Sequence, residues 1–279
     1  MNSSNGQLPT TIVLIHGLWV TARCWEQWIP YYEQRGFRVL APPWPGLDGE
    51  VEAIRADPSR LERLDTATVA HHYETIIRAL ASPPILIGHS MGGALVQILL
   101  DRGLGAAGVA IHSVPVKGVL RLPLSTLRAA WPVLRNPGNR NKAVMLTPEQ
   151  FHYAFTNTLS REESDRVYER YAIPCTGRMV FEGATANFNP RAASKVDFEK
   201  EDRAPLLFIA GDADHIVPAK LNRWTFEHYK SGIVAYHELA GRDHWTCGAA
   251  GWEAVADYAL DWALDPVAAT AHGTKAARG

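Results

Sequence analysis

The sequence contains little cysteine, no excess of charge of either sign and no apolar run long enough to cross a membrane. Its three cysteines, Cys24, Cys175 and Cys247, are too few and too scattered for a disulfide framework or a zinc site. We therefore expect buried free thiols in a reducing compartment. The 28 Lys and Arg nearly balance the 29 Asp and Glu, for a formal net charge of −1. Because no dense basic run stands out, neither nucleic acid nor a membrane is an expected partner.

The N-terminal residues 1–6 also lack the basic and apolar regions of a secretory signal peptide. This predicts a cytoplasmic protein, and the expected assembly is a monomer or a homodimer. A chain of 279 residues can bury a substantial core as one large domain with an inserted subdomain.

What the sequence does contain is an alternation of short apolar runs with amphipathic stretches. The apolar runs have the length of strands and lie at 10–15, 37–41, 84–87, 107–112, 205–210 and 233–239. Stretches with helical spacing follow them, at 22–35, 66–80, 94–100, 219–229 and 252–264. Such alternation predicts an α/β fold with a mostly parallel central sheet of about six strands and helices on both faces.

The alternation stops between 116 and 203, where only helical patterns follow one another. They lie at 122–133, 148–158, 160–171 and 176–185, and a capping box over 160–163 marks the start of the third. We interpret 116–203 as a helical cap inserted at the carboxyl edge of the sheet, where ligands bind in open α/β sheets. The α/β core then comprises 1–115 and 204–265, and the Ala-rich 266–279 is expected to be a disordered tail.

The hexapeptide Gly88-His89-Ser90-Met91-Gly92-Gly93 stands between a predicted strand and a predicted helix. Strand, Gly-x-Ser-x-Gly and helix together are typical of a nucleophile elbow. The turn is so tight that a Cβ at Gly88 or Gly92 would collide with the neighbouring strand or helix. The turn also places the Ser90 hydroxyl over the N-terminus of the helix, whose free N–H groups favour negative charge. Ser90 is therefore the candidate nucleophile.

A serine hydroxyl becomes a strong nucleophile only when a base takes its proton, and the base needs a third group to orient it. Both partners are expected after later strands. His244 follows the predicted strand at 233–239 and is the candidate base. Two acids, Asp212 and Asp214, follow the predicted strand at 205–210, and their position leaves both open.

Together these segments resemble the α/β-hydrolase fold superfamily, in particular cofactor-free esterases, lactonases and serine-dependent haloperoxidases. The resemblance spans residues 10–250 and is carried by His16-Gly17, the 88–93 hexapeptide, Gly211-x-x-Asp214 with Val217-Pro218, and Asp243-His244. It implies that Ser90 is the nucleophile, His244 the general base and Asp214 the orienting acid. It also implies that the backbone N–H groups of Leu18 and Met91 form the oxyanion hole, and that no metal or cofactor is required.

The match departs from the superfamily at one loop, where Asp-x-Pro-Gly is common and this chain has Pro43-Trp44-Pro45-Gly46. Trp44 is expected to narrow the mouth of the pocket there. The other predicted pocket residues are Trp19, which directly follows Leu18, and Trp131 and Phe155 in the cap. Further cap residues are expected to face the pocket or the core: Leu122, Leu127, Phe151 and Met179. For His16 and His89, structural hydrogen bonding is a sufficient explanation.

The resemblance implies a serine hydrolase that cleaves a carboxylic ester or lactone of a small, fairly apolar molecule through an acyl-Ser90 intermediate. The alternatives keep the same triad: a carbon–carbon bond hydrolase, a lyase, or a haloperoxidase-like perhydrolase. A further alternative is a ligand receptor with vestigial hydrolysis. Fold and triad do not separate these functions, because function depends on the details of the site. In every case the expected partner is a small molecule.

Overall fold

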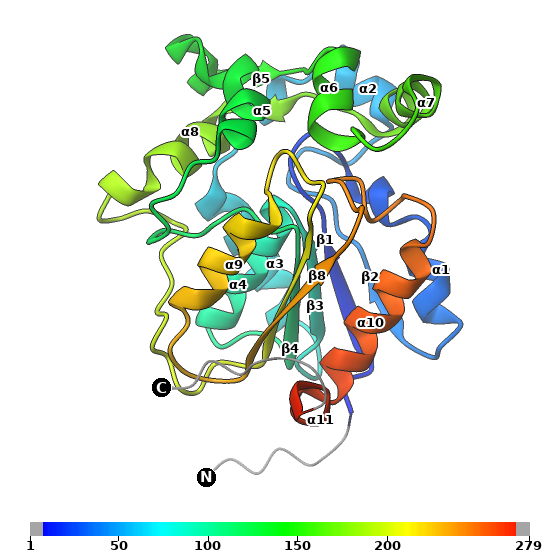
Figure 1. Cartoon of the computed structure of the whole chain (residues 1–279), viewed down its shortest axis with the longest axis vertical. Coiled ribbons are helices and arrows are strands. Elements are labelled where there is room, and N and C mark those ends of the chain that lie inside the picture. The colour runs from blue at the N-terminus through cyan, green and yellow to red at the C-terminus, as the bar shows by residue number, and fades with distance from the viewer. Residues whose placement is uncertain (1–7, 272–279) are drawn as a thin grey trace.

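A computed structural model describes residues 8–271 of the chain. Its centre is a sheet of six parallel strands in the order β2-β1-β3-β4-β7-β8 (Figure 1). The strands are β1 (Thr11–Ile15), β2 (Arg38–Leu40), β3 (Ile85–His89), β4 (Ala107–Ile111), β7 (Leu206–Gly211) and β8 (Val234–Leu239). The predicted parallel α/β sheet is confirmed.

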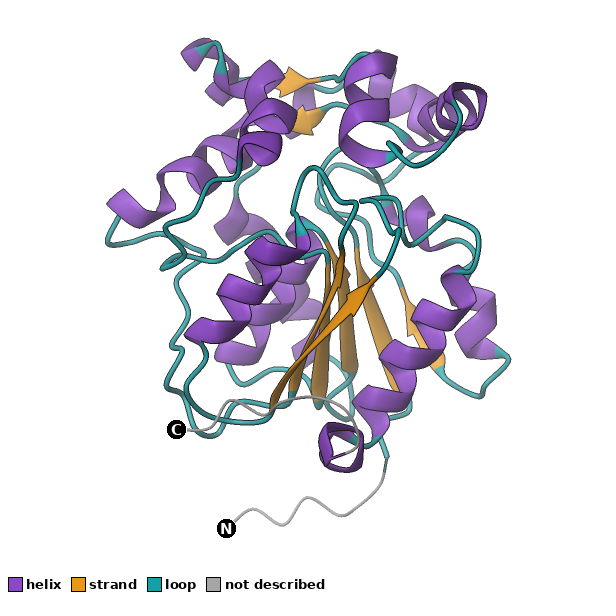
Figure 2. Cartoon of the chain, viewed as in Figure 1, coloured by secondary structure: helices purple, strands orange, loops and turns teal. Residues whose placement is uncertain are grey.

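Helices cover both faces of this sheet, as Figure 2 shows. Helices α3 (Thr66–Arg78), α4 (Met91–Asp101) and α9 (Ala219–His228) lie on one face, and α1 (Trp28–Glu33) and α10 (Trp252–Leu264) lie on the other. Strands β1, β3, β4 and β7 are buried along their whole length, which explains why their sequences are continuously apolar and do not alternate.

The predicted helix at 22–35 is instead two short elements, the 3-10 helix η1 (Ala22–Trp25) and α1. Pro30 explains the break, since in one continuous helix it would lie in the interior, where proline removes a hydrogen bond and clashes with the preceding turn. In α1 it lies in the first turn, where no hydrogen bond is lost. The loop before α3 contains helix α2 (Val51–Ala56) and the 3-10 helix η2 (Ser59–Leu61).

The segment between β4 and β7 is mainly helical and lies over the carboxyl ends of the strands (Figure 1). Its helices are α5 (Leu124–Leu134), α6 (Pro148–Phe155), α7 (Arg161–Tyr171) and α8 (Gly177–Thr185), with short 3-10 turns η3 (Pro137–Asn141) and η4 (Ala186–Phe188). The capping box at the start of α7 is present. A two-stranded antiparallel ribbon of β5 (Ala143–Val144) and β6 (Cys175–Thr176) was not expected, because two residues are too few to show a pattern. We call this segment the cap.

After α10 the chain forms another helix, α11 (Pro266–Ala271), where the sequence predicts the start of a disordered tail. The reason is local: the Asp265 side chain accepts a hydrogen bond from the backbone N–H of Ala268, and Pro266 occupies the first helical position. The rest of the predicted tail lies outside the described residues. Within the described range, the helices are too short or too polar to cross a bilayer.

Candidate active site

Strand β3 ends at His89 and helix α4 begins at Met91, so the chain turns between them at Ser90 alone. Ser90 has φ 58° and ψ −119°, backbone angles that residues with a side chain rarely adopt. A Cβ on Gly88 would overlap the carbonyl group of Gly92, and a Cβ on Gly92 would overlap that of Ile15. Only glycine fits these two positions, as a nucleophile elbow requires.

Asp214 and His244 are hydrogen-bonded to each other in the interior of the protein. His244 Nδ1 donates to Asp214 Oδ2 across 2.7 Å, and both side chains are fully buried. Asp214 Oδ1 accepts hydrogen bonds from the backbone N–H groups of Ile216 and Val217, at 2.7 and 2.9 Å. Burial by itself would raise the pKa of Asp214, but the neighbouring imidazoles and their hydrogen bonds outweigh it and hold the pKa well below its usual range. Asp214 is therefore a fixed carboxylate.

Of the two candidate acids, only Asp214, which the resemblance favours, reaches His244. Asp212 is exposed, and its carboxylate accepts a hydrogen bond from the backbone N–H of Gly241 at 2.7 Å. Asp212 thus links two loops at the surface and does not orient the histidine.

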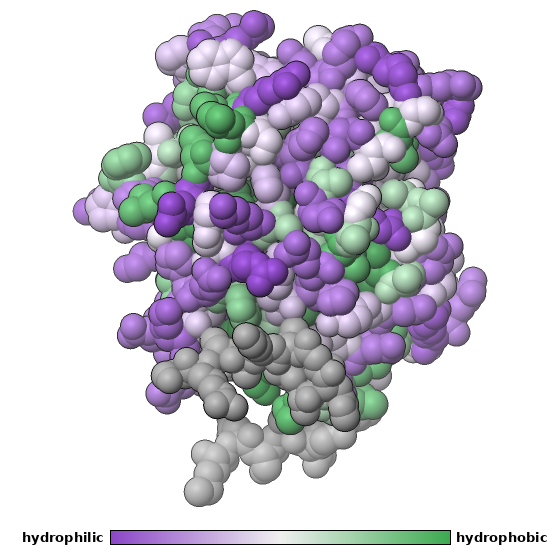
Figure 3. All heavy atoms as spheres, viewed as in Figure 1, coloured by the Kyte–Doolittle hydropathy of each residue, from purple (hydrophilic) through white to green (hydrophobic). Residues whose placement is uncertain are grey.

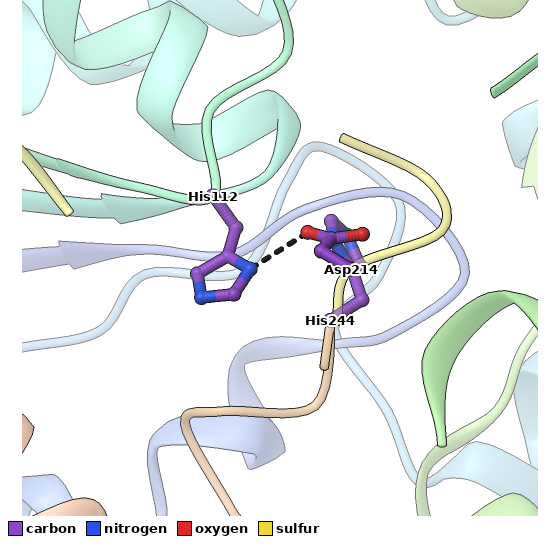
Figure 4. A group of neighbouring side chains, drawn as sticks. All are labelled: His112, Asp214 and His244. Carbon is purple, nitrogen blue, oxygen red and sulfur yellow. Dashed lines mark hydrogen bonds and ion pairs between the residues drawn. The ribbon is translucent and has the colours of Figure 1, made fainter. Parts of the chain in front are cut away.

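A second imidazole, which the sequence does not single out, reaches the same oxygen of Asp214. His112 follows β4, is fully buried and donates from Nδ1 to Asp214 Oδ2 across 2.6 Å (Figure 4). No sequence motif marks His112, but the order of the strands in the sheet predicts its position. Because β4 is paired with β7, a side chain that follows β4 lies beside the acid that follows β7.

His112, Asp214 and His244 are also a group that could hold a metal ion, since their ligand atoms lie within 4.8 Å of one another. Each imidazole, however, uses its Nδ1 proton to bind the carboxylate, so a cation would have to displace both protons. The donor set therefore fits a hydrogen-bonded network better than a metal centre.

Ser90 and His244 are linked through His89. The ring centroids of His89 and His244 are 4.6 Å apart, and His89 Nε2 donates to the carbonyl oxygen of His244 across 2.8 Å. His244 Nε2 is buried and has no hydrogen-bond partner among the described residues, so it is not bonded to Ser90 Oγ. This nitrogen is free to take a proton, and catalytic hydrogen bonds often tighten only when a substrate is bound.

The loop that follows β1 packs directly on Ser90. A Cβ on Gly17 would lie 2.7 Å from Ser90 Cβ and 3.2 Å from Ser90 Oγ. Within the described part of the chain, the backbone N–H groups of Leu18 and Met91 donate no hydrogen bond. Leu18 directly follows Gly17, and Met91 directly follows Ser90, so both N–H groups belong to the backbone at this contact. Unpaired donors beside a serine are what a developing negative charge needs.

His16 and Trp44 support this loop. Their rings stack with centroids 4.6 Å apart, His16 Nδ1 donates to the carbonyl oxygen of Gly17 at 2.9 Å, and His16 Nε2 accepts from the backbone N–H of Trp44 at 3.3 Å. Burial lowers the pKa of His16 to about 4, so the ring is neutral near pH 7. The expected structural role fits His16 and also His89. Trp44 does not narrow a pocket mouth, because it is buried against His16.

Of the predicted pocket residues, Phe155 lies next to His244, and Trp19 lies next to Phe155. Phe155, the last residue of α6, meets the His244 ring edge to face at a centroid distance of 5.0 Å. The Trp19 ring lies 6.2 Å from the Phe155 ring, also edge to face. Trp19 has φ 63°, and the three non-glycine residues with positive φ in the described range are Trp19, Ser90 and His112. Backbone strain is thus concentrated around this site.

The prediction for Trp131 is wrong, because its side chain is 54% exposed. Trp131 lies on α5 opposite the buried Ala129 and Val133, so this helix turns its other face inward. Leu122, also expected to face inward, is 62% exposed. The remaining apolar cap residues named from the sequence are buried or half-buried: Leu127, Phe151 and Met179.

Cap residues 153–158 hold the two loops that carry Asp214 and His244. The four residues that flank these two side chains all bond to this segment, as follows: His215 Nδ1 to the Tyr153 carbonyl at 2.8 Å, Trp245 N–H to the Phe155 carbonyl at 2.9 Å, Asn157 Nδ2 to the Ala213 carbonyl at 2.9 Å, and Thr158 Oγ1 to Asp243 Oδ2 at 2.6 Å. The cap therefore takes part in fixing the geometry of the site.

The sequence matches the Alpha/beta hydrolase family over residues 12–258. The chain belongs to this family. Methylesterase 8 from Arabidopsis thaliana is 22% identical over 250 residues, which cover 86% of this hydrolase and 85% of the relative. Among solved structures, the monoacylglycerol lipase of Paleococcus ferrophilus has a TM-score of 0.63 at 21% identity, covering 92% of this chain and 95% of the lipase. A pyrethroid hydrolase from Sphingobium faniae has a TM-score of 0.63 at 20% identity, covering 93% and 99%. These structural likenesses show the shared fold.

Acid should destabilise the hydrolase between pH 6.5 and 4, because the structure keeps His16 and His89 neutral. Burial lowers the pKa of His16 to about 4; burial and the adjacent histidines lower that of His89 well below its usual value. In the unfolded chain both rings bind a proton below about pH 6.5, so the unfolded state binds more protons and stability rises with pH in this window. Each ring contributes a slope of up to about 1.4 kcal/mol per pH unit.

Urea unfolding at a series of pH values measures this slope. His16→Gln should lower stability near pH 7 but flatten its dependence on pH below about 6.5, since one of the two neutral rings is gone. An unchanged slope in the variant would show that His16 is not the source.

Proposed function

We propose that this hydrolase cleaves a carboxylic ester or lactone of a small, fairly apolar molecule through an acyl-Ser90 intermediate. The observation that carries the proposal is the buried Asp214–His244 hydrogen bond beside an elbow that presents Ser90. Family membership supports hydrolysis, and the names of two similar proteins, a methylesterase and a pyrethroid hydrolase, support an ester bond.

In the proposed reaction Ser90 Oγ attacks the carbonyl carbon while its proton passes to His244 Nε2. Asp214 accepts a hydrogen bond from the Nδ1–H group of His244, which keeps the Nε2 lone pair available, and its charge stabilises the imidazolium. The N–H groups of Leu18 and Met91 bind the oxyanion. His244 then protonates the leaving oxygen, and a water that it deprotonates releases the acid from acyl-Ser90.

His112 adds a second proton donor to Asp214, and its removal should alter the pH dependence of the reaction. In His112→Asn, which tolerates the positive φ of 48°, the carboxylate keeps one imidazole donor and holds the His244 proton more tightly. We expect kcat/KM to fall roughly 10- to 100-fold, the usual range for a hydrogen bond to a charged group, and its acid limb to move to higher pH. If His112 had a purely structural role, its replacement would lower kcat/KM without shifting the pH at which kcat/KM falls on the acid side.

Phe155 should control which acyl chains the enzyme prefers, because its ring contacts His244. In Phe155→Ala the space beside the base grows, and discrimination between esters should change by roughly 1–3 kcal/mol per methylene, in favour of longer chains. The measurement is kcat/KM for p-nitrophenyl esters of graded chain length. Phe198→Ala, which removes a ring packed against Tyr229, is the control for lost packing and should lower all rates alike. Parallel losses in Phe155→Ala would remove Phe155 from the specificity argument.

A panel of p-nitrophenyl esters and lactones tests the proposed reaction directly. We expect turnover with a burst of alcohol that corresponds to one acyl group per chain. Turnover of a diketone or a cyanohydrin with none of any ester would favour carbon–carbon hydrolysis or lyase chemistry. A single stoichiometric release of product would favour a receptor.

A further inference from the structure

Most of the exposed large apolar side chains lie on the cap. Among described residues there are seven such side chains, and five belong to one stretch of the cap and its neighbour η4: Leu120, Leu122, Leu124, Trp131 and Phe188. Hydrogen bonds of Asn187 to Gly118 and Val119, at 2.7 and 3.0 Å, hold η4 beside the start of this stretch. In Figure 3 hydrophobic residues gather at the upper left, where Figure 1 places α5 and α8.

The same stretch is basic. Between 116 and 148 the sequence has six Lys and Arg and no Asp or Glu, although the whole chain is balanced. Arg121, Arg128, Arg135 and Lys142 recur every seven residues, and all four are exposed. None of them forms an ion pair with an acid in the described structure, and the Arg128 guanidinium lies over the Tyr153 ring, 3.9 Å from its centroid. Lys220 extends the charge onto α9, since it and Arg121 lie over the same Trp224 ring.

On helix α5, exposed apolar side chains and basic side chains lie on the same face. Leu124, Arg128, Trp131 and Arg135 follow one another at helical spacing and are all exposed. We call the set of Leu120, Leu122, Leu124, Arg128, Trp131, Arg135 and Phe188 the cap outer face. It combines aliphatic side chains, an indole and guanidinium groups with no compensating acid.

We propose that the cap outer face docks on the surface of an anionic lipid bilayer. Leucine and phenylalanine side chains can enter the boundary between headgroups and acyl chains, tryptophan favours that interface, and arginines on the same helix reach lipid phosphates. The sequence alone argued against a membrane partner because it has no dense basic run. Of these basic residues, Arg128 and Arg135 lie on one face of α5 and at its C-terminal end, so the helix brings them together although seven residues separate them in the sequence.

Two other occupants fit this surface less well. A second copy of the chain, packed about a twofold axis, would bring the same unpaired arginines against each other. A nucleic acid would match the charge but leave the exposed leucines in water. Of these three occupants, the anionic bilayer matches both the charge and the apolar side chains. The proposal does not depend on the reaction proposed above, because binding can be measured without turnover.

The test is cosedimentation of the full chain with vesicles of phosphatidylcholine alone or with about one third phosphatidylserine. We expect binding to the anionic vesicles, weakened by salt, and little binding to the neutral ones. Arg128→Gln with Arg135→Gln should weaken binding roughly fivefold for each charge removed. Leu122→Ser with Leu124→Ser should weaken it further, with retained ester turnover or an unchanged melting temperature as the check on folding.

Matched controls lie at the amino edge of the sheet, opposite the cap in Figure 1. Leu8 is 64% exposed, close to the 62% of Leu122, and Arg38 is an exposed arginine at the start of β2. Leu8→Ser and Arg38→Gln should leave vesicle binding unchanged. The proposal is wrong if the protein ignores anionic vesicles, if the control variants lose binding equally, or if the cap variants instead abolish a dimer seen by sedimentation.

Discussion

Replacing Ser90 with alanine should abolish ester hydrolysis, with kcat falling by on the order of 10⁴ to 10⁶. The alanine methyl group cannot attack the carbonyl carbon, so no acyl-enzyme forms, while the unpaired N–H groups of Leu18 and Met91 can still bind an oxyanion. Turnover of a p-nitrophenyl ester measures the loss. A fluorophosphonate probe should label the wild-type chain once and the variant not at all.

The control for this experiment is Ser113→Ala. Ser113 is also buried, but its hydroxyl accepts a hydrogen bond from Gln97 Nε2 at 2.8 Å and donates one to the Val114 carbonyl oxygen at 3.0 Å. This variant should keep both labelling and turnover, apart from a modest loss of stability. Persistent labelling of Ser90→Ala would mean that another residue is the nucleophile.

Asp214→Asn should lower kcat by about 10⁴ even though the shape of the side chain is kept. Four donors converge on this carboxylate: the Nδ1–H groups of His112 and His244 and the backbone N–H groups of Ile216 and Val217. An amide offers one oxygen and one NH₂, so its NH₂ would face donors, and an imidazole would have to change its tautomer. If His244 changes, Nε2 carries the proton and the ring cannot act as a base.

Asp212→Asn is the matched control, two residues earlier in the same loop. Its carboxylate is exposed and bonds to the backbone of Gly241, so the amide oxygen can replace it. Steady-state rates of the two variants, compared with their melting temperatures, decide the assignment. A large loss in Asp212→Asn with normal activity in Asp214→Asn would reverse the choice of acid.

Much of the fold was predictable from local sequence. Strands such as β1 and β3 are buried on both faces and therefore read as unbroken apolar runs, and the helices between them follow their periodicity. The position of Ser90 was predictable for a stronger reason. The backbone at the elbow leaves no room for a Cβ at Gly88 and Gly92. A turn of this kind therefore requires glycine at both positions, and the two glycines are visible in the sequence.

Exposure and tail structure were harder to predict. The apolar pattern of α5 does not say which face turns inward, so Trp131 was expected in a pocket and lies at the surface. Helix α11 depends on one cap at Asp265, which a composition rich in alanine does not reveal. The packing of neighbouring elements settles the first point, and a single hydrogen bond settles the second.

The sequence by itself determined the sheet, the elbow at Ser90 and the two loops that supply an acid and a histidine, because each depends on residues close together in the chain. Only the tertiary structure decided that the Asp214 carboxylate, which the family resemblance already favoured, is hydrogen-bonded to His244, that His112 shares its oxygen and that cap residues 153–158 bond to both loops. His112 and Asp214 are 102 residues apart and meet because β4 and β7 are paired in the sheet. Such contacts follow from strand order and loop geometry, which no local pattern of residues encodes.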